Sequence, residues 1–146
     1  MPYVRRDFEI VISPLVCDES GVCSNVSIIP LDEEDKEFAY NILRYCSTKD
    51  CALSYKKGRK VKNAGEAETL ALAKRFEVPI VLHDKLACNW ARTYRVSLIK
   101  LVDLPDNLRN VPNESLIEFY GRLCRQRSSD KACEKFARLT SKHIHW

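Results

Sequence analysis

The stretch Gly65–Asp84, GEAETLALAKRFEVPIVLHD, decides the fold class because it predicts a helix followed directly by a β-strand. Alanine and leucine recur through its first half, which favours a helix. Pro79 then precedes the apolar run Ile80–Leu82, which is typical of a short buried strand. Glu66 lies in the first helical turn and Asp84 just past the strand, at the sheet edge where open parallel sheets bind ligands. Two carboxylates that meet there form a cluster of the kind that commonly binds Mg²⁺ or Mn²⁺.

The sequence on either side continues the alternation of strands and helices. Phe8–Ile12 and Val26–Pro30 are short apolar runs typical of strands, and Asp32 is a typical N-cap for the helix that follows. Leu86–Tyr94 has helical periodicity, and Val96–Val102 is again typical of a strand. This order predicts an α/β fold with a mostly parallel sheet and helices on its faces.

The C-terminal region predicts a helical hairpin. Glu114–Arg125 and Lys131–His143 are both expected to be helices, and a short polar turn separates them. Cys124 and Cys133 flank that turn, close enough in antiparallel helices to form a disulfide.

Length and composition indicate one domain. The chain has 146 residues, of which 45% are hydrophobic, and this is enough to bury a core. We expect an α/β core over residues 1–105 and the hairpin over residues 106–146. The formal net charge of +4 makes only a mild electrostatic case for a polyanionic partner. The sequence has no run of eighteen apolar residues and no signal-peptide pattern, so we expect a cytoplasmic protein without a membrane span.

Two pairs of segments resemble the PIN-domain nucleases, in which a Gly-Glu-x-Glu helix precedes a strand ending in Asp. GEAETLALA at Gly65–Ala73 and VLHDKLACNWARTYRV at Val81–Val96 carry the resemblance. FEIVISPLVCDES at Phe8–Ser20 and VSIIPLDEEDKEFAYNIL at Val26–Leu43 look like the preceding strand–helix units. The resemblance covers roughly Phe8–Pro105. It implies a three-layer PIN-like fold and a metal-dependent endoribonuclease that cleaves RNA phosphodiester bonds.

The resemblance also implies a carboxylate site for Mg²⁺ or Mn²⁺, which would activate water for attack on the phosphate. Glu19, with Asp18 as the alternative, falls where the family has the acidic end of its second element. Glu66 and Asp84 fall where it has the acidic residues after the variable loop and after the next strand. These three are the expected catalytic residues and metal ligands. Glu68 lies about 200° around the helix from Glu66, so both cannot face one ion.

The chain departs from the family at its N-terminus. PIN domains usually open with a central strand that ends in Asp, and this chain has no such strand before Phe8. Asp7 precedes the first predicted strand, so it would lie at the opposite edge of the sheet. Three carboxylates still suffice for Mg²⁺ or Mn²⁺, which keep several waters. Another strand, such as one lent by a second copy in a homodimer, would have to fill the gap in the sheet.

The segment between Cys46 and Lys62 is polar and basic, and we expect either a solvated loop or a short amphipathic turn. Tyr55 could stack on a base. The basic side chains around Gly58 could contact RNA phosphates: Lys56, Lys57, Arg59, Lys60 and Lys62.

Seven cysteines leave three explanations open. Cys46 and Cys51 have a spacing that suits half of a zinc site. Disulfides in a chain without a secretion signal would indicate a hyperthermophilic archaeon or its virus. Alternatively, most of the cysteines are small buried hydrophobic residues.

Two functions of different classes therefore compete. One is a PIN-like Mg²⁺- or Mn²⁺-dependent endoribonuclease, and the other is a PIN-like module that binds RNA or a protein partner without cleavage. A third, a redox-responsive protein, lacks a Cys-x-x-Cys motif to support it.

Overall fold

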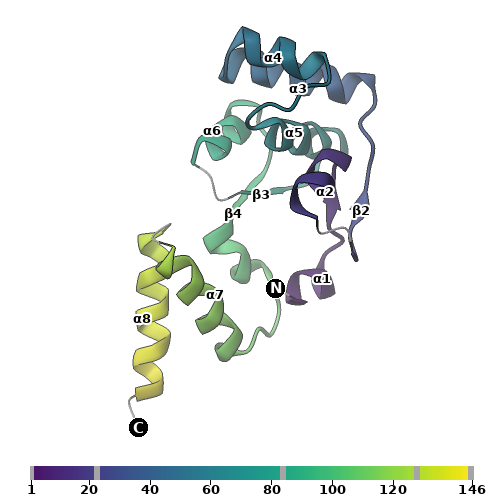
Figure 1. Cartoon of the computed structure of the whole chain (residues 1–146). Coiled ribbons are helices and arrows are strands. Elements are labelled where there is room, and N and C mark those ends of the chain that lie inside the picture. The colour runs from purple at the N-terminus through teal and green to yellow at the C-terminus, as the bar shows by residue number, and fades with distance from the viewer. Residues whose placement is uncertain (1, 22–23, 83–84, 127–128, 145–146) are drawn as a thin grey trace. The chain divides into compact units, whose positions relative to one another are not determined.

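The chain divides into two compact units, which we describe separately. The computed structural model describes residues 2–21, 24–82, 85–126 and 129–144 (Figure 1). Residues 9–99 form the first unit, here called the α/β unit. Residues 1–8 and 100–146 form the second, here called the helical unit.

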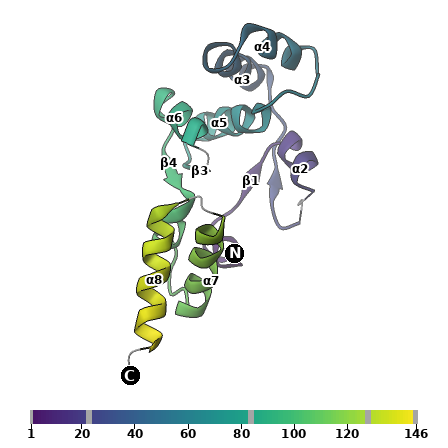
Figure 2. The same ribbon diagram turned by 60° about the vertical axis from the view of Figure 1, so that its left-hand side comes forward.

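The α/β unit contains two short strand pairs and five helices among its described residues. β1 pairs with β2 in parallel, with Val11 opposite Ser27, and β3 pairs with β4 in a separate parallel pair. Helix α3 packs against both α4 and α5, and these three helices lie side by side in Figure 2. The elements are β1 (Val11–Ile12), α2 (Pro14–Ser20), β2 (Ser27–Ile28), α3 (Glu33–Cys46), α4 (Lys49–Lys56), α5 (Ala64–Phe76), β3 (Ile80–Leu82), α6 (Lys85–Thr93) and β4 (Leu98–Lys100).

The mixed α/β class and the parallel pairing are confirmed, but the described strands do not join into one central sheet. The predicted strand Val96–Val102 shortens because residues 101–107 turn into the 3-10 helix η1 (Leu101–Asn107), which contains Pro105. Proline lacks a backbone N–H and cannot donate to a sheet ladder. The segment Phe8–Ile12 likewise pairs only over its last two residues.

Helices, rather than a sheet, therefore supply most of the core of the α/β unit. The middle of α5 is rich in alanine, and small side chains let α3 approach it closely. The largest side chains that are fully buried here are Ile42 and Leu43 of α3 and Leu70 of α5. The remaining buried members of this cluster are Ala39, Ala52, Ala67, Ala71, Ala73, Ile80, Trp90, Ala91 and Val96.

The start of α3 confirms Asp32 as an N-cap. Its side chain accepts a hydrogen bond from the Asp35 backbone N–H at 2.8 Å, and Asp35 accepts one from the Asp32 N–H at 3.0 Å. Arg75 of α5 pairs with both carboxylates, at 2.9 and 3.0 Å. The Asp35 N–H and the Arg75 guanidinium hold the pKa of Asp32 below its usual value. These acidic residues are thus accounted for by capping and by the tie between α3 and α5.

The helical unit confirms the predicted C-terminal hairpin. It contains α1 (Pro2–Asp7), η1, α7 (Asn113–Arg125) and α8 (Asp130–Ile144). Helices α7 and α8 pack along each other and bury a cluster with η1: Val102, Tyr120, Leu123 and Ala132.

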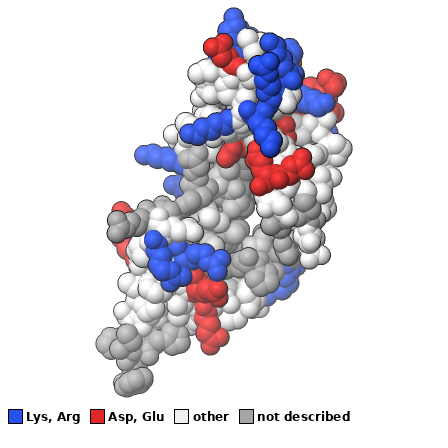
Figure 3. Space-filling view, viewed as in Figure 1, with Lys and Arg blue, Asp and Glu red and all other residues white. Residues whose placement is uncertain are grey.

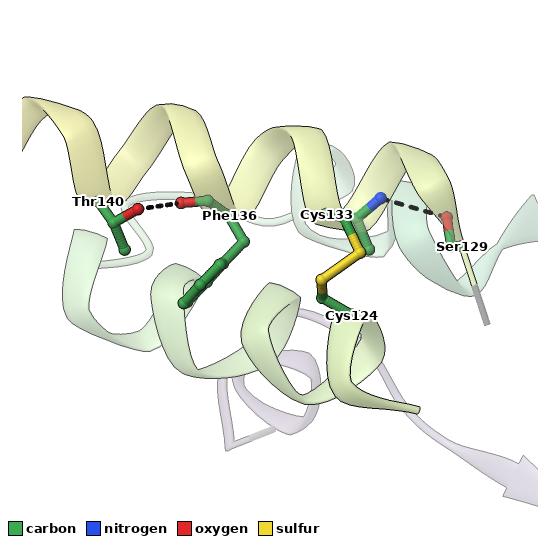
Figure 4. Close-up of a disulfide and its surroundings, with 6 residues drawn as sticks. Cys124, Ser129, Cys133, Phe136 and Thr140 are labelled. Carbon is green, nitrogen blue, oxygen red and sulfur yellow. Dashed lines mark hydrogen bonds between the residues drawn. A yellow bond between two sulfur atoms is a disulfide. The ribbon is translucent and has the colours of Figure 1, made fainter. Parts of the chain in front are cut away.

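The disulfide between Cys124 and Cys133 is present, with Cα atoms 4.8 Å apart (Figure 4). It joins the end of α7 to the start of α8, as the spacing predicted. Cys17 is disulfide-bonded as well, whereas Cys46, Cys51 and Cys88 are free thiols. The cysteines of the described segments thus include both crosslinked and unlinked members.

Asp7 ties α1 to the segment after η1 within the helical unit. Its carboxylate accepts hydrogen bonds from the Arg6 guanidinium, at 2.9 Å, and from the Arg109 backbone N–H, at 3.0 Å. The Arg6 hydrogen bonds, followed by that from Arg109, hold the pKa of Asp7 far below its usual value. The carboxylate is therefore already saturated with donors.

This arrangement predicts a pH dependence of stability. Because the pKa of Asp7 is lower in the folded state than in the unfolded state, its charged carboxylate stabilises the fold. This stabilisation is complete at pH values above the unfolded-state pKa of 3.8, and it is lost as the pH falls below that value toward the folded-state pKa. We expect the difference in unfolding midpoint between the wild type and Asp7→Asn to be constant near neutral pH and to shrink below pH 3.8. Urea unfolding across this range measures it. A difference that does not change with pH would show that Asp7 acts through packing alone.

Candidate metal and RNA site

Two of the three predicted acidic residues lie on neighbouring helices of the α/β unit. Glu19 is in the last turn of α2, and Glu66 is in the first turn of α5. Helix α2 packs against α5. Asp84, the third residue, lies outside the described residues, so its position relative to the other two stays a prediction.

Glycine at position 65 leaves room for Glu19 at the start of α5. A Cβ atom built on Gly65 would lie 2.9 Å from Oε2 of Glu19 and 3.5 Å from Cγ2 of Val16. The Glu19 carboxylate therefore occupies the space that a side chain at residue 65 would fill, at the first turn of α5, which also carries Glu66. Gly65 is buried, Glu66 is half-buried and Glu19 is exposed, so the pair borders solvent.

The first turn of α5 gives the two carboxylates a favourable electrostatic setting. A helix N-terminus carries partial positive charge, which stabilises nearby anions. Asn63, the N-cap residue, has φ 67° and makes no side-chain capping hydrogen bond. Glu19 and Glu66 thus also act as counter-charges for the helix dipole, an account of their position that needs no metal.

Glu68 points to a different neighbour, as its angular offset from Glu66 predicted. It accepts a hydrogen bond of 2.7 Å from the hydroxyl of Tyr55, the penultimate residue of α4. Burial, together with this bond, raises the pKa of Tyr55. The half-buried Tyr55 ring packs against the core cluster, and its stacking on a base stays a prediction.

The basic segment is partly helical rather than a loop or a short turn. Lys49–Lys56 forms α4, with Thr48 accepting a hydrogen bond from the Cys51 N–H at the N-cap. Lys56 ends the helix, and its Nζ lies 4.9 Å from the centroid of the Tyr40 ring. This helix was missed because half of its residues are polar and only Ala52 is fully buried.

The rest of the segment, residues 57–63, forms an exposed connection into α5. We call its basic side chains, with Lys56, the basic loop: Lys56, Lys57, Arg59, Lys60 and Lys62, all exposed. In Figure 3 a column of basic side chains begins over α4 and runs toward acidic side chains over α2. The basic loop leads into Gly65 and Glu66 along the chain, so positive and negative groups border the same end of α5.

The chemistry of the site fits a hard divalent ion. Carboxylate oxygens are the ligands that Mg²⁺ and Mn²⁺ prefer, and the space over Gly65 is filled by such an oxygen. Within the described ranges, no group of three or more His, Cys, Asp or Glu residues is arranged to hold a metal. This applies to the zinc alternative for Cys46 and Cys51 as well. Asp84, the third member of the predicted set, lies outside the described residues.

Comparison of the chain with protein-family models, with curated proteins and with solved structures gives no match. In the part of the chain that the structure describes, no helix is both long and apolar enough to cross a membrane.

Proposed function

We propose that the α/β unit is a PIN-like, metal-dependent endoribonuclease domain. The observation that carries the proposal is the contact of the Glu19 carboxylate with the start of α5, next to Glu66. Helix α2 and helix α5 are far apart in sequence, yet each presents one of the acidic residues that the PIN resemblance singled out. The exposed basic loop precedes the same turn of α5.

Each residue has a defined role in this proposal. Glu19, Glu66 and Asp84 hold one Mg²⁺ or Mn²⁺ ion through their carboxylate oxygens. A bound divalent ion supplies an activated water and stabilises charge on the phosphate. The basic loop contacts RNA phosphates and keeps the strand beside the carboxylates, which would otherwise repel it.

A second candidate is a PIN-like module that binds RNA, a second copy of the chain or another protein without cleavage. The pairing of Asp7 favours it. The family's first acidic residue has no counterpart in the sequence, and Asp7, which precedes the first predicted strand, is paired with Arg6 and Arg109 within the helical unit. Asp7 is therefore not free to serve as a further ligand beside the three expected carboxylates.

The decisive experiment is a cleavage assay with the full chain. End-labelled single-stranded RNA is incubated with the purified protein in Mn²⁺, in Mg²⁺ and in EDTA. Cleavage that needs the metal supports the endoribonuclease. RNA that is bound but not cut under all three conditions would overturn the endoribonuclease proposal and support the non-catalytic module.

The basic loop gives a prediction that does not depend on cleavage. Replacing its first four basic residues with Gln removes phosphate contacts, and each lost contact lowers the salt slope of single-strand binding by about 0.7. We expect weaker RNA binding and a slope smaller by up to about 3 in filter-binding titrations over a salt series. The residues changed are Lys56, Lys57, Arg59 and Lys60.

The matched control removes the same charge elsewhere on the α/β unit. Its four residues are also exposed and lie on α3, α4 and α6: Lys36, Arg44, Lys49 and Arg92. We expect this variant to change RNA binding much less. Equal effects of the two variants would mean that net charge, and not the basic loop, governs binding.

A further inference from the structure

Gly65 is not required by the backbone at its position. Among the described glycines, Gly21 and Gly58 have positive φ, and Gly65 does not. It is the second residue of α5, where glycine is a poorer helix former than alanine. Local conformation therefore gives no reason for a glycine there.

The reason lies in what a side chain would displace. An added Cβ would stand 2.9 Å from Glu19 Oε2, closer than Cβ atoms approach other atoms, whereas the contact with Val16 at 3.5 Å is ordinary. The one clashing atom is the end of a flexible, exposed side chain. Alanine at residue 65 would thus turn the Glu19 carboxylate away from α5 and leave the packing of the two helices intact.

We propose that Gly65 is a positioning residue: by having no side chain, it leaves room for the Glu19 carboxylate at the first turn of α5, from which Glu19 and Glu66 ligate one divalent ion. This inference rests on the proposed metal-dependent function. It assigns Gly65 a role in metal affinity and not in stability. Packing glycines behave differently, because their substitution overfills a core.

Mn²⁺ titration calorimetry on the full chain, without RNA, tests the inference. We expect Gly65→Ala to weaken Mn²⁺ binding by about tenfold or more, as displaced carboxylates near metals do, with no decrease in the thermal unfolding midpoint. Combining it with Glu19→Asp should restore binding to within about threefold of the wild type, because the shorter side chain leaves room for the methyl group.

Gly121 supplies the matched control. A Cβ there would lie 2.9 Å from Cε2 of Phe136, a ring packed between α7 and α8 (Figure 4). We expect Gly121→Ala to lower the unfolding midpoint and leave Mn²⁺ affinity unchanged, the reverse of Gly65→Ala.

The outcomes separate the inference from the function. If the wild type binds Mn²⁺ and Gly65→Ala binds it equally well, the inference is wrong and the nuclease proposal stands. The inference is also wrong if Gly65→Ala loses both affinity and stability and Glu19→Asp restores neither. A wild type that binds no Mn²⁺ overturns the metal-dependent function, and the role of Gly65 with it.

Discussion

The Glu66→Gln protein is expected to bind RNA normally and to lose Mn²⁺-dependent cleavage by at least about 100-fold. Glutamine keeps the volume of the half-buried side chain but removes the charge that a metal ligand needs. The Glu19 carboxylate lies over Gly65, and Glu66 is the next residue of α5. The change therefore removes one of the proposed metal ligands. Single-turnover cleavage of end-labelled RNA measures the effect. Asp84→Asn is expected to behave in the same way.

Glu68→Gln is the matched control for Glu66→Gln. It makes the same chemical change two residues away, at a side chain that accepts a hydrogen bond from Tyr55 and can still accept one as an amide. We expect cleavage near the wild-type rate. Wild-type cleavage by Glu66→Gln and Asp84→Asn, with EDTA still inhibitory, would place the metal elsewhere and end the assignment of these residues.

The second large effect concerns the helical unit. We expect Cys124→Ser/Cys133→Ser to lower the free energy of unfolding by about 2–3 kcal/mol, because the disulfide limits the entropy of the unfolded chain. The two cysteines are nine residues apart and close a short loop. Guanidinium unfolding of the full chain measures the change. Since Cys17 is also disulfide-bonded, substitution isolates this crosslink where a reductant would not.

Cys51→Ser serves as the control, because Cys51 is a free, half-buried thiol of the α/β unit. It should shift the unfolding curve much less. Mass spectrometry of non-reduced tryptic peptides gives a direct check. Finding Cys124 and Cys133 both alkylated in protein purified without reductant would contradict the crosslink.

The sequence predicted the helices best, since their signals are local. Asp32 supplied a capping side chain, and the alanine- and leucine-rich run after Glu66 gave α5 within a residue at its start. The hairpin helices α7 and α8 were predicted to within one residue at each end. Helix α4 was missed because it buries little apolar surface, and α1 because it is short.

The extent of the sheet could not be predicted from local pattern. Strand pairing depends on which segments meet in space, and β1 and β2 form ladders of only two residues each. Some residues of the apolar runs that predicted longer strands lie outside the observed strands. Leu101 and Val102, for example, belong to η1. A continuous sheet requires long-range contacts that periodicity alone does not specify.

The arrangement of the candidate site likewise depends on long-range packing that the local sequence pattern does not specify. Glu19 and Glu66 were selected by resemblance to PIN domains, but the approach of Glu19 to the start of α5 depends on how α2 packs against α5. The role of Gly65 appears once the Glu19 side chain is placed. In the sequence, the only indication of this role is a glycine at the second position of an otherwise strong helix. The residue that lies against it, Glu19, is known only from the structure.

The hydrogen bond between Tyr55 and Glu68 has a consequence for how the basic loop meets a ligand. It fixes the end of α4 to α5, so the connecting residues 57–63 are anchored on both sides. A segment restrained in this way has fewer conformations to give up when it contacts a phosphate chain. Less of the interaction energy is then spent on ordering the loop, and contacts from a few lysine and arginine side chains yield more net affinity.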